Sequence, residues 1–370
     1  MNHTPTATAV AHASMTRDDR SSDPHTSRGP IAATAHRTPR APCPASDSPP
    51  SAETLEQKDS TPMRLGLGLP HLGPLATSQA IRTVAAAAED AGLHSLWAMD
   101  RLLSPVSPRT LAYPGRTDGT PPTAQQTVID PLVALTVAAT VTDRITVGTD
   151  VLVAPWYAQV LLARSLAAID QVSSGRLVVG LGLGWSVDEF EAVGVAMPGR
   201  GRRIEEILDV LTAVWNDETV EISTPHERIA PSVMGAKPVQ RPRPPILLGA
   251  SNQAGLERIA RRADGWLPFG LPLDEIEHRW SEVLEMAERS GRDPDQLQLV
   301  VRADPRLDGQ HAGRARAAFI GSCSQVMGDI ARVTELGATE MILDFHATAR
   351  SVDELVDSAL CLTERTLLAA

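Results

Sequence analysis

Eight short runs rich in Val, Ile and Leu alternate with helical patterns between Met63 and the C-terminus. The expected strands are 64–70, 94–99, 145–153, 177–183, 246–249, 265–269, 297–301 and 341–345. Such alternation indicates parallel βαβ units, because a parallel connection needs a crossover that a helix supplies. Eight units are typical of a (β/α)8 barrel, which usually takes about 250 residues before insertions. The pattern therefore predicts an α/β chain folded as a TIM barrel over residues 63–370.

Between these strands, apolar residues recur at the spacing of amphipathic helices. Helices are expected at 78–91, 131–139, 203–215 and 274–289, with a last one starting near Ser351. Two insertions add to the barrel: a Pro- and Gly-rich loop at 101–129, and residues 216–244, with an extended stretch near 220–222. A doubly wound sheet is the alternative fold, but it would prefer five or six strands and a reversal of strand order.

Residues 1–62 differ from the rest of the chain. They hold nine prolines, no Trp, Tyr or Phe, and only Ile31 and Leu55 among Ile and Leu. A segment this poor in apolar residues cannot offset the entropy of ordering it, so we expect a disordered extension. Since a clear strand pattern begins at Met63, a translation start at Met63 is a second hypothesis. Intact mass of the natively expressed protein tests it.

Charge and composition exclude several classes of protein. The formal net charge is −11, which argues against the clustered basic surface of a nucleic-acid-binding protein. No apolar run approaches the roughly twenty residues of a spanning helix, and no signal peptide is recognisable. The three cysteines show no C-x-x-C spacing, so we expect neither a disulfide framework nor a cysteine-built metal site, and we expect a reducing cytoplasm.

Active sites of (β/α)8 barrels lie at the C-terminal ends of the strands. The expected ends carry His71; Asp100 and Arg101; Thr149, Asp150 and Val151; Gly182, Gly184 and Trp185; Gly249, Ala250, Ser251 and Asn252; Arg302 and Asp304; and Asp344 and His346. The glycine run at 180–184 resembles a dinucleotide fingerprint, but Trp185 stands where the last glycine belongs, so alone it is a weak signal. The loop 249–252 precedes a helix, whose N-terminal N–H groups attract anions; an ordinary helix cap is the other reading.

Several motifs resemble one family. They are ITVGTDVL at 145–152, LARSLAAID at 162–170, SGRLVVGLGLGW at 174–185, KPVQRPRPPILLG at 237–249 and ADGW at 263–266. Together they are similar to the bacterial luciferase-like (LLM class) flavin and deazaflavin oxidoreductases, and most similar to the coenzyme F420-dependent branch. The resemblance excludes residues 1–62 and weakens after Trp266.

The resemblance implies a barrel that binds the cofactor across its strand ends, and a homodimer. It implies that a bulge at Asp150-Val151, often a non-prolyl cis peptide in the family, supports the deazaflavin ring. The cofactor-binding residues it implies are Asp100, Thr149, Asp150, Val151, Gly182, Gly184, Trp185, Gly249, Ala250, Ser251 and Asn252. Arg200, Arg202 and Arg203 are candidates for contact with an acidic cofactor tail, or form a structural basic cluster.

The chain departs from the family at the end of the second strand. Many relatives carry Asp-His there, whereas this chain carries Asp100-Arg101, and arginine stays protonated and cannot shuttle protons. Arg101 is expected to contact an anion or to pair with Asp100. His71 is then the first candidate for proton transfer and Glu189 the second, while Asp344 with His346 is the third.

The resulting hypothesis is an F420-dependent oxidoreductase that moves a hydride between a deazaflavin and a small organic substrate. The first alternative is an FMN-dependent luciferase-like monooxygenase that needs a reductase partner. The second is a flavin- or deazaflavin-binding barrel without catalysis, because the matching histidine is missing. The sequence does not identify the substrate.

Overall fold

The computed structural model describes residues 63–110, 113–114, 116, 118–307 and 316–369. Two expectations concern residues 1–62, namely a disordered extension and a translation start at Met63. Residues 1–62 lie outside the described part of the chain. Among the described residues, no helix combines the length and hydropathy that crossing a membrane requires.

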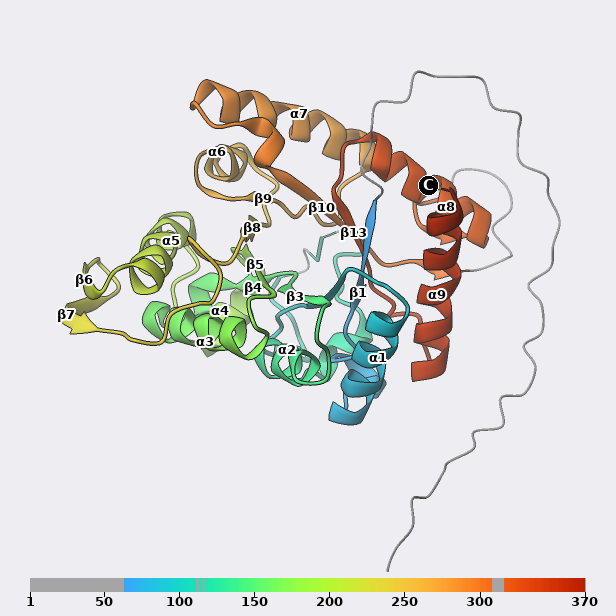
Figure 1. Ribbon diagram of the computed structural model, residues 1–370, viewed down its shortest axis with the longest axis horizontal. Helices are drawn as coiled ribbons and strands as arrows, with labels where there is room; N and C mark the ends of the chain where they lie inside the picture. The colour runs from blue at the N-terminus through green and yellow to red at the C-terminus, as the bar shows by residue number, and fades with distance from the viewer. Residues whose placement is uncertain (1–62, 111–112, 115, 117, 308–315, 370) are drawn as a thin grey trace, which may run out of the picture. The chain divides into compact units, whose positions relative to one another are not determined.

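Parallel strands form a closed ring in the described part of the chain (Figure 1). They are β1 (Arg64–Gly68), β2 (Ser95–Ala98), β3 (Thr146–Thr149), β4 (Leu152–Val153), β5 (Leu177–Gly182), β8 (Ile246–Leu248), β9 (Gly265–Trp266), β10 (Gln298–Ala303) and β13 (Glu340–Leu343). The order is β3-β2-β1-β13-β10-β9-β8-β5-β4, and an additional β3–β5 pairing closes the ring. Since β3 and β4 are two parts of one strand, the described residues form eight barrel strands. The predicted (β/α)8 TIM barrel is confirmed.

Helices surround the ring on its outer side (Figure 1). They are α1 (Ser78–Asp90), α2 (Pro131–Ala139), α3 (Gln159–Val172), α4 (Val187–Ala192), α5 (Arg200–Asn216), α6 (Gln253–Arg262), α7 (Leu273–Arg289), α8 (Cys323–Glu335) and α9 (Val352–Ala369). The first insertion holds a 3-10 turn, η2 (Thr123–Gln126), and the second holds the antiparallel hairpin of β6 (Thr219–Ser223) and β7 (Arg228–Val233). A short parallel pair, β11 (Arg306–Leu307) and β12 (Ile320–Gly321), follows β10.

Local signals explain where several helices begin and end. Asp130 accepts hydrogen bonds from the N–H groups of Leu132 and Val133 at the start of α2. Pro131 suits the first position of this helix, because proline has no N–H group that would need an acceptor there. Gly92, with φ +77°, follows α1 in the left-handed conformation that favours glycine. The helix expected at 203–215 begins earlier, at Arg200, because Gly199 with φ +85° sets its first turn.

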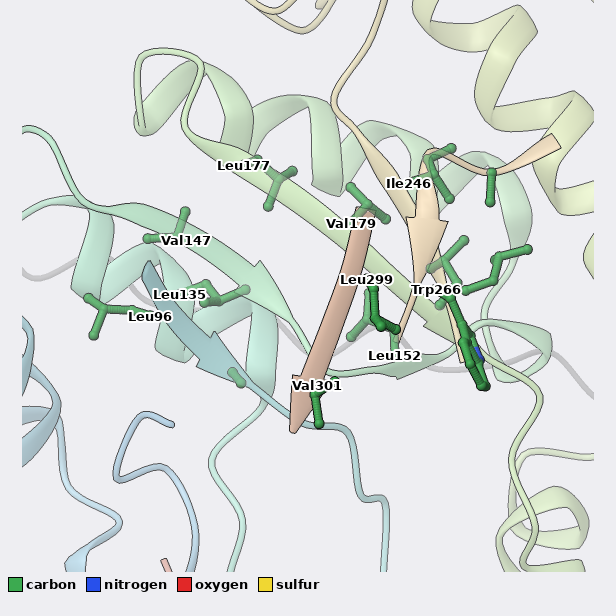
Figure 2. Close-up of a cluster of buried hydrophobic side chains, with 14 of the residues drawn as sticks. Leu96, Leu135, Val147, Leu152, Leu177, Val179, Ile246, Trp266, Leu299 and Val301 are labelled. Atoms are coloured by element: carbon green, nitrogen blue, oxygen red, sulfur yellow. The ribbon is translucent and has the colours of Figure 1, made fainter. Parts of the chain in front are cut away.

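Side chains alternate between the helical layer and the barrel interior along each strand. Leu96 faces outward and lies in one apolar cluster with Val147 and with Leu135 of α2 (Figure 2). Trp97, the next residue, belongs to a separate interior cluster, and its indole Nε1 donates to Ser95 Oγ at 2.6 Å. This two-residue period is what a pleated strand imposes.

Candidate functional site at the strand ends

The barrel strand made of β3 and β4 is interrupted by a cis peptide bond between Asp150 and Val151, at the position that the resemblance implied. Thr149 fastens the strand to β5 just before this point. Its hydroxyl donates to the carbonyl oxygen of Gly180 and accepts from the Gly180 N–H, both at 2.8 Å. Thr149 is fully buried, so it holds the bulge in place and does not itself reach the mouth of the barrel.

Glycines of neighbouring strands leave room for the Val151 side chain. A Cβ atom at Gly182 would lie 2.5 Å from Val151 Cγ2, and one at Gly249 would lie 3.6 Å from Val151 Cγ1. Gly184, with φ +71°, would place a Cβ 2.5 Å from Val153 Cγ1. Val151 is half-buried, so these glycines allow a small apolar side chain to stand at the mouth. The fold therefore brings Val151, Gly182 and Gly249 together, and their role in binding a cofactor stays a prediction.

A buried charge cluster lies beside the bulge. Arg302 of β10 places Nη2 2.8 Å from Asp344 Oδ2 and Nε 3.5 Å from Asp150 Oδ2, and Asp304 lies 3.4 Å from its Nη2. The Asp344 N–H donates to the Ala303 carbonyl oxygen at 2.9 Å, which keeps the ends of β10 and β13 together. Burial opposes the charge on Arg302, yet the three carboxylates raise the pKa of the guanidinium.

Asp150 has no hydrogen-bond partner on either carboxylate oxygen. Burial raises its pKa to about 7, although Arg302 favours the ionised form. A buried carboxylate without hydrogen bonds is costly, and the Arg302 guanidinium 3.5 Å away is its charged neighbour.

His346 and Asp344 form a dyad at the end of β13. The Nδ1 atom of His346 is hydrogen-bonded to Asp344 Oδ1, and the Nε2 atom is buried without a partner. Burial disfavours the imidazolium, but Asp344 outweighs it and raises the pKa of His346. His346 borders a cavity of about 1120 Å³ together with residues of the first insertion and of α9, while its side chain is only 1% exposed. An oriented imidazole with one unpartnered nitrogen is an arrangement that general acid–base catalysis uses.

Asp304, Asp344 and His346 also bring three ligand-type atoms within 4.8 Å of one another. A divalent ion is a poor fit there, because the Arg302 guanidinium already lies 2.8 Å from Asp344 and supplies the cation.

Arg101 pairs with Glu189 and not with Asp100. Its Nη1 donates to Glu189 Oε2 at 2.9 Å, with both side chains almost fully buried, and Glu189 Oε1 accepts from the N–H groups of Leu102 and Leu103. Burial raises the pKa of Glu189, although Arg101 and these N–H groups favour its ionised form. The ion pair fixes the start of the first insertion against α4.

Asp100 is held by other partners. Its Oδ2 accepts from the Tyr157 hydroxyl at 2.9 Å and from the Val153 N–H at 3.1 Å. Burial raises its pKa to about 6, against the effect of these two hydrogen bonds.

His71 lies away from any opening. It is 1% exposed, and its Nδ1 and Nε2 atoms lie 2.9 Å from the carbonyl oxygens of Leu69 and Met99. Burial lowers its pKa, although both carbonyls favour the protonated ring. Both ring nitrogens are therefore engaged by backbone, in contrast to His346.

The loop 249–252 is tied to its surroundings by backbone carbonyls. The Trp266 Nε1 donates to the Ala250 carbonyl oxygen at 3.0 Å, and Arg279 donates to that of Ser251. Asn252 accepts from the Gly255 N–H at 2.9 Å and so caps α6. Asn252 is therefore an ordinary helix cap, the alternative that the sequence left open. Within this loop, Gly249 is the residue that lies beside Val151.

A row of aromatic rings lies between the guanidinium groups of Arg101 and Arg302 at the strand ends. The Arg101 guanidinium carbon lies 4.9 Å from the Trp185 ring centroid, and that of Arg302 lies 4.7 Å from Phe269. Tyr113 contacts both rings edge to face, at 5.7 Å from Trp185 and 6.1 Å from Phe269. Sequence reasoning did not single out Tyr113, which lies in the first insertion without a motif. Phe269 and Arg302 lie at expected strand ends, but the sequence assigned neither of them a role.

Comparisons with known proteins identify the family and agree with the barrel fold. A model of the family described as luciferase-like monooxygenase matches residues 61–359. Uncharacterized protein Rv0953c of Mycobacterium tuberculosis (strain ATCC 25618 / H37Rv) is 32% identical over 272 residues, which are 72% of this chain and 86% of that protein. The FMNH2-dependent dimethylsulfone monooxygenase of Pseudomonas putida is 29% identical over 153 residues, which are 40% of this chain and 42% of that protein.

The solved structure of a coenzyme F420-dependent tetrahydromethanopterin reductase from Methanopyrus kandleri is similar in fold. Its TM-score is 0.64 at 16% identity, over 81% of this chain and 98% of that chain. The similar proteins thus include one described as F420-dependent and one as FMNH2-dependent. Because the family model spans most of the sequence, this chain belongs to the luciferase-like monooxygenase family.

Proposed function

We propose that the protein is an F420-dependent oxidoreductase that transfers a hydride to or from a small organic substrate. The observation that carries the proposal is the mouth of the barrel beside Val151. The small apolar side chain of Val151 stands there beside Gly182 and Gly249, and the adjoining Asp150 carboxylate lies 3.5 Å from Arg302 Nε. The half-buried Val151 side chain would support one face of a flat heterocycle.

Arginines near the start of α5 favour the deazaflavin over FMN. Arg200 and Arg203 lie in its first turn, and each has a buried Nε without a hydrogen-bond partner. The exposed Arg202 lies between them, and the helix N-terminus adds partial positive charge. F420 carries carboxylates beyond its phosphodiester, so it gains more than FMN from such a cluster.

The bound cofactor supplies the hydride chemistry, and the chain's own residues hold the proton. When a carbonyl or similar group is reduced, its oxygen needs a proton as well as a hydride. His346 is the residue to which we assign it, because Asp344 fixes Nδ1 and the buried Nε2 has no hydrogen-bond partner. The pKa of His346 is raised, so the donor form persists near neutral pH.

A second candidate is the FMN-dependent monooxygenase. It is favoured by the relative described as FMNH2-dependent, whose matched segment is 29% identical to this chain. The same bulge and glycines suit either ring, so the cofactor's polar tail is the feature that distinguishes the two proposals.

Titration of the purified protein with oxidised F420 and with FMN tests the proposal. We expect F420 to bind at least about tenfold more tightly, as measured by quenching of its fluorescence. Arg200→Ala and Arg203→Ala should weaken F420 binding more than FMN binding, while Arg164→Ala, at an exposed position of α3, serves as the matched control. Tighter binding of FMN would overturn the proposal in favour of the monooxygenase.

Binding without any hydride transfer to the acceptors tried would favour the non-catalytic barrel. The homodimer remains a prediction, and light scattering coupled to gel filtration tests it.

A further inference from the structure

Two cysteines far apart in the sequence lie side by side on the outer layer. Cys323 is the first residue of α8, and Cys361 lies in α9, 38 positions later. Their Sγ atoms are 3.3 Å apart. Both residues are half-buried.

The approach of the two sulfurs is set by well-anchored elements. Ser322 caps α8 in a full capping box with Gln325, which fixes the residue that follows it. Cys361 is followed by Leu362 and Thr363, both buried, so its turn of α9 is packed against the molecule. A disulfide requires sulfurs about 2.0 Å apart. The gap must therefore close by about 1.3 Å, which is within the range of side-chain adjustment.

We propose that Cys323 and Cys361 form a reversible disulfide when the protein meets a hydroperoxide. The partial positive charge at the N-terminus of α8 stabilises a thiolate at Cys323, which makes it the attacking sulfur. The thiolate takes the distal oxygen of the peroxide, which breaks the O–O bond and releases an alcohol or water. The sulfenic acid so formed condenses with the Cys361 thiol, releases water and leaves the S–S bond. Two electrons pass from the thiols to the peroxide.

The crosslink would close a loop of the chain that contains His346, the proposed proton donor. The closed loop contains β13, Asp344 and His346, and α9 contributes Glu354 and Ser358 to the cavity beside His346. Oxidation therefore fixes α9 against α8 next to that cavity, and a dithiol reductant restores the open form. The disulfide itself depends only on the two sulfurs, so it is independent of the proposed cofactor.

The test uses the full-length chain, reduced and then treated with a small excess of hydrogen peroxide. Ellman titration under denaturing conditions should fall from three thiols to one, with a mass decrease of about 2 Da and a crosslinked peptide pair containing Cys323 and Cys361. The melting temperature should rise by a few degrees and return after dithiothreitol, because the link restricts the unfolded chain.

Cys323→Ser and Cys361→Ser should each abolish the mass loss and the rise in melting temperature, while Cys43→Ser is the matched control and should change neither. Circular dichroism establishes that the variants fold. A link that involves Cys43, a crosslinked dimer, or oxidation of single cysteines by 16 Da without an S–S bond would overturn the proposal.

Discussion

Replacing Asp150 with asparagine should stabilise the protein at neutral pH, by an amount that depends on pH. The Asp150 carboxyl has a pKa of about 7 in the folded barrel against 3.8 ordinarily. Each tenfold change in an ionisation constant is worth about 1.4 kcal/mol, so keeping this carboxylate ionised in the fold costs about 4 kcal/mol above pH 7. The amide side chain of the variant has no charge to bury, and Arg302 keeps Asp344 at 2.8 Å as its anionic partner.

The sign follows from proton binding in the two states. Between about pH 4 and 7 the folded protein holds a proton on Asp150 that the unfolded chain has lost, so wild-type stability falls as pH rises. The substitution removes this contribution. The free energy of unfolding of Asp150→Asn minus that of wild type should therefore increase by about 1.4 kcal/mol per pH unit and level off above pH 7.

Urea denaturation at several pH values from 4.5 to 8 measures this difference. Tryptophan fluorescence and far-ultraviolet circular dichroism should give coincident curves, as two-state analysis requires. Asp217→Asn makes the same chemical change at an exposed site. The groups facing Asp150 are Arg302, Asp344, His346 and Asp304, and they are present in both proteins. A difference that does not change with pH would refute the reasoning, because the carboxyl would then ionise alike in both states.

Three further outcomes follow from other contacts. Arg101→Met should cost about 3–5 kcal/mol of stability in urea denaturation because it strands the buried Glu189, and adding Glu189→Gln should recover part of that loss. Gly180→Ala should not give soluble folded protein, since its Cβ would lie 1.9 Å from the Thr149 carbonyl oxygen, whereas Gly235→Ala, with open space, should fold normally. His346→Gln should lower kcat by about 10²–10⁴ with cofactor affinity unchanged, and the wild-type rate of substrate reduction should fall as pH rises through the raised pKa of His346, because the donor proton is then lost. An unchanged kcat would remove His346 from the proton pathway.

Much of the barrel could be predicted because its signals are local. The strand periods, the Asp130-Pro131 helix start and the glycine after α1 each depend on a few neighbouring residues, and all appear where expected. The bulge at Asp150-Val151 was placed by resemblance, and its backbone geometry agrees. Residues at strand ends could also be enumerated, since the fold fixes which edge they share.

The roles of the individual residues at this edge could not be predicted from the sequence. His71 and His346 both follow predicted strands, and no pattern separates them. Packing does: both nitrogens of His71 lie against backbone carbonyls, while Asp344 holds one nitrogen of His346 and the other has no hydrogen-bond partner. Likewise Arg101 has Asp100 as its chain neighbour but pairs with Glu189, 88 positions away.

The sequence by itself therefore determined the eight-strand barrel and the edge at which its polar side chains gather, because these depend on hydrophobic period and strand direction. The tertiary structure decided which of those side chains neutralise one another and which keep a polar atom without a hydrogen-bond partner. Arg302 meets Asp150, 152 positions earlier, only because the ring closes and brings β10 and β3 to one mouth. Burial then fixes the charge of each group, and burial is a property of the packed barrel and not of any local stretch of sequence.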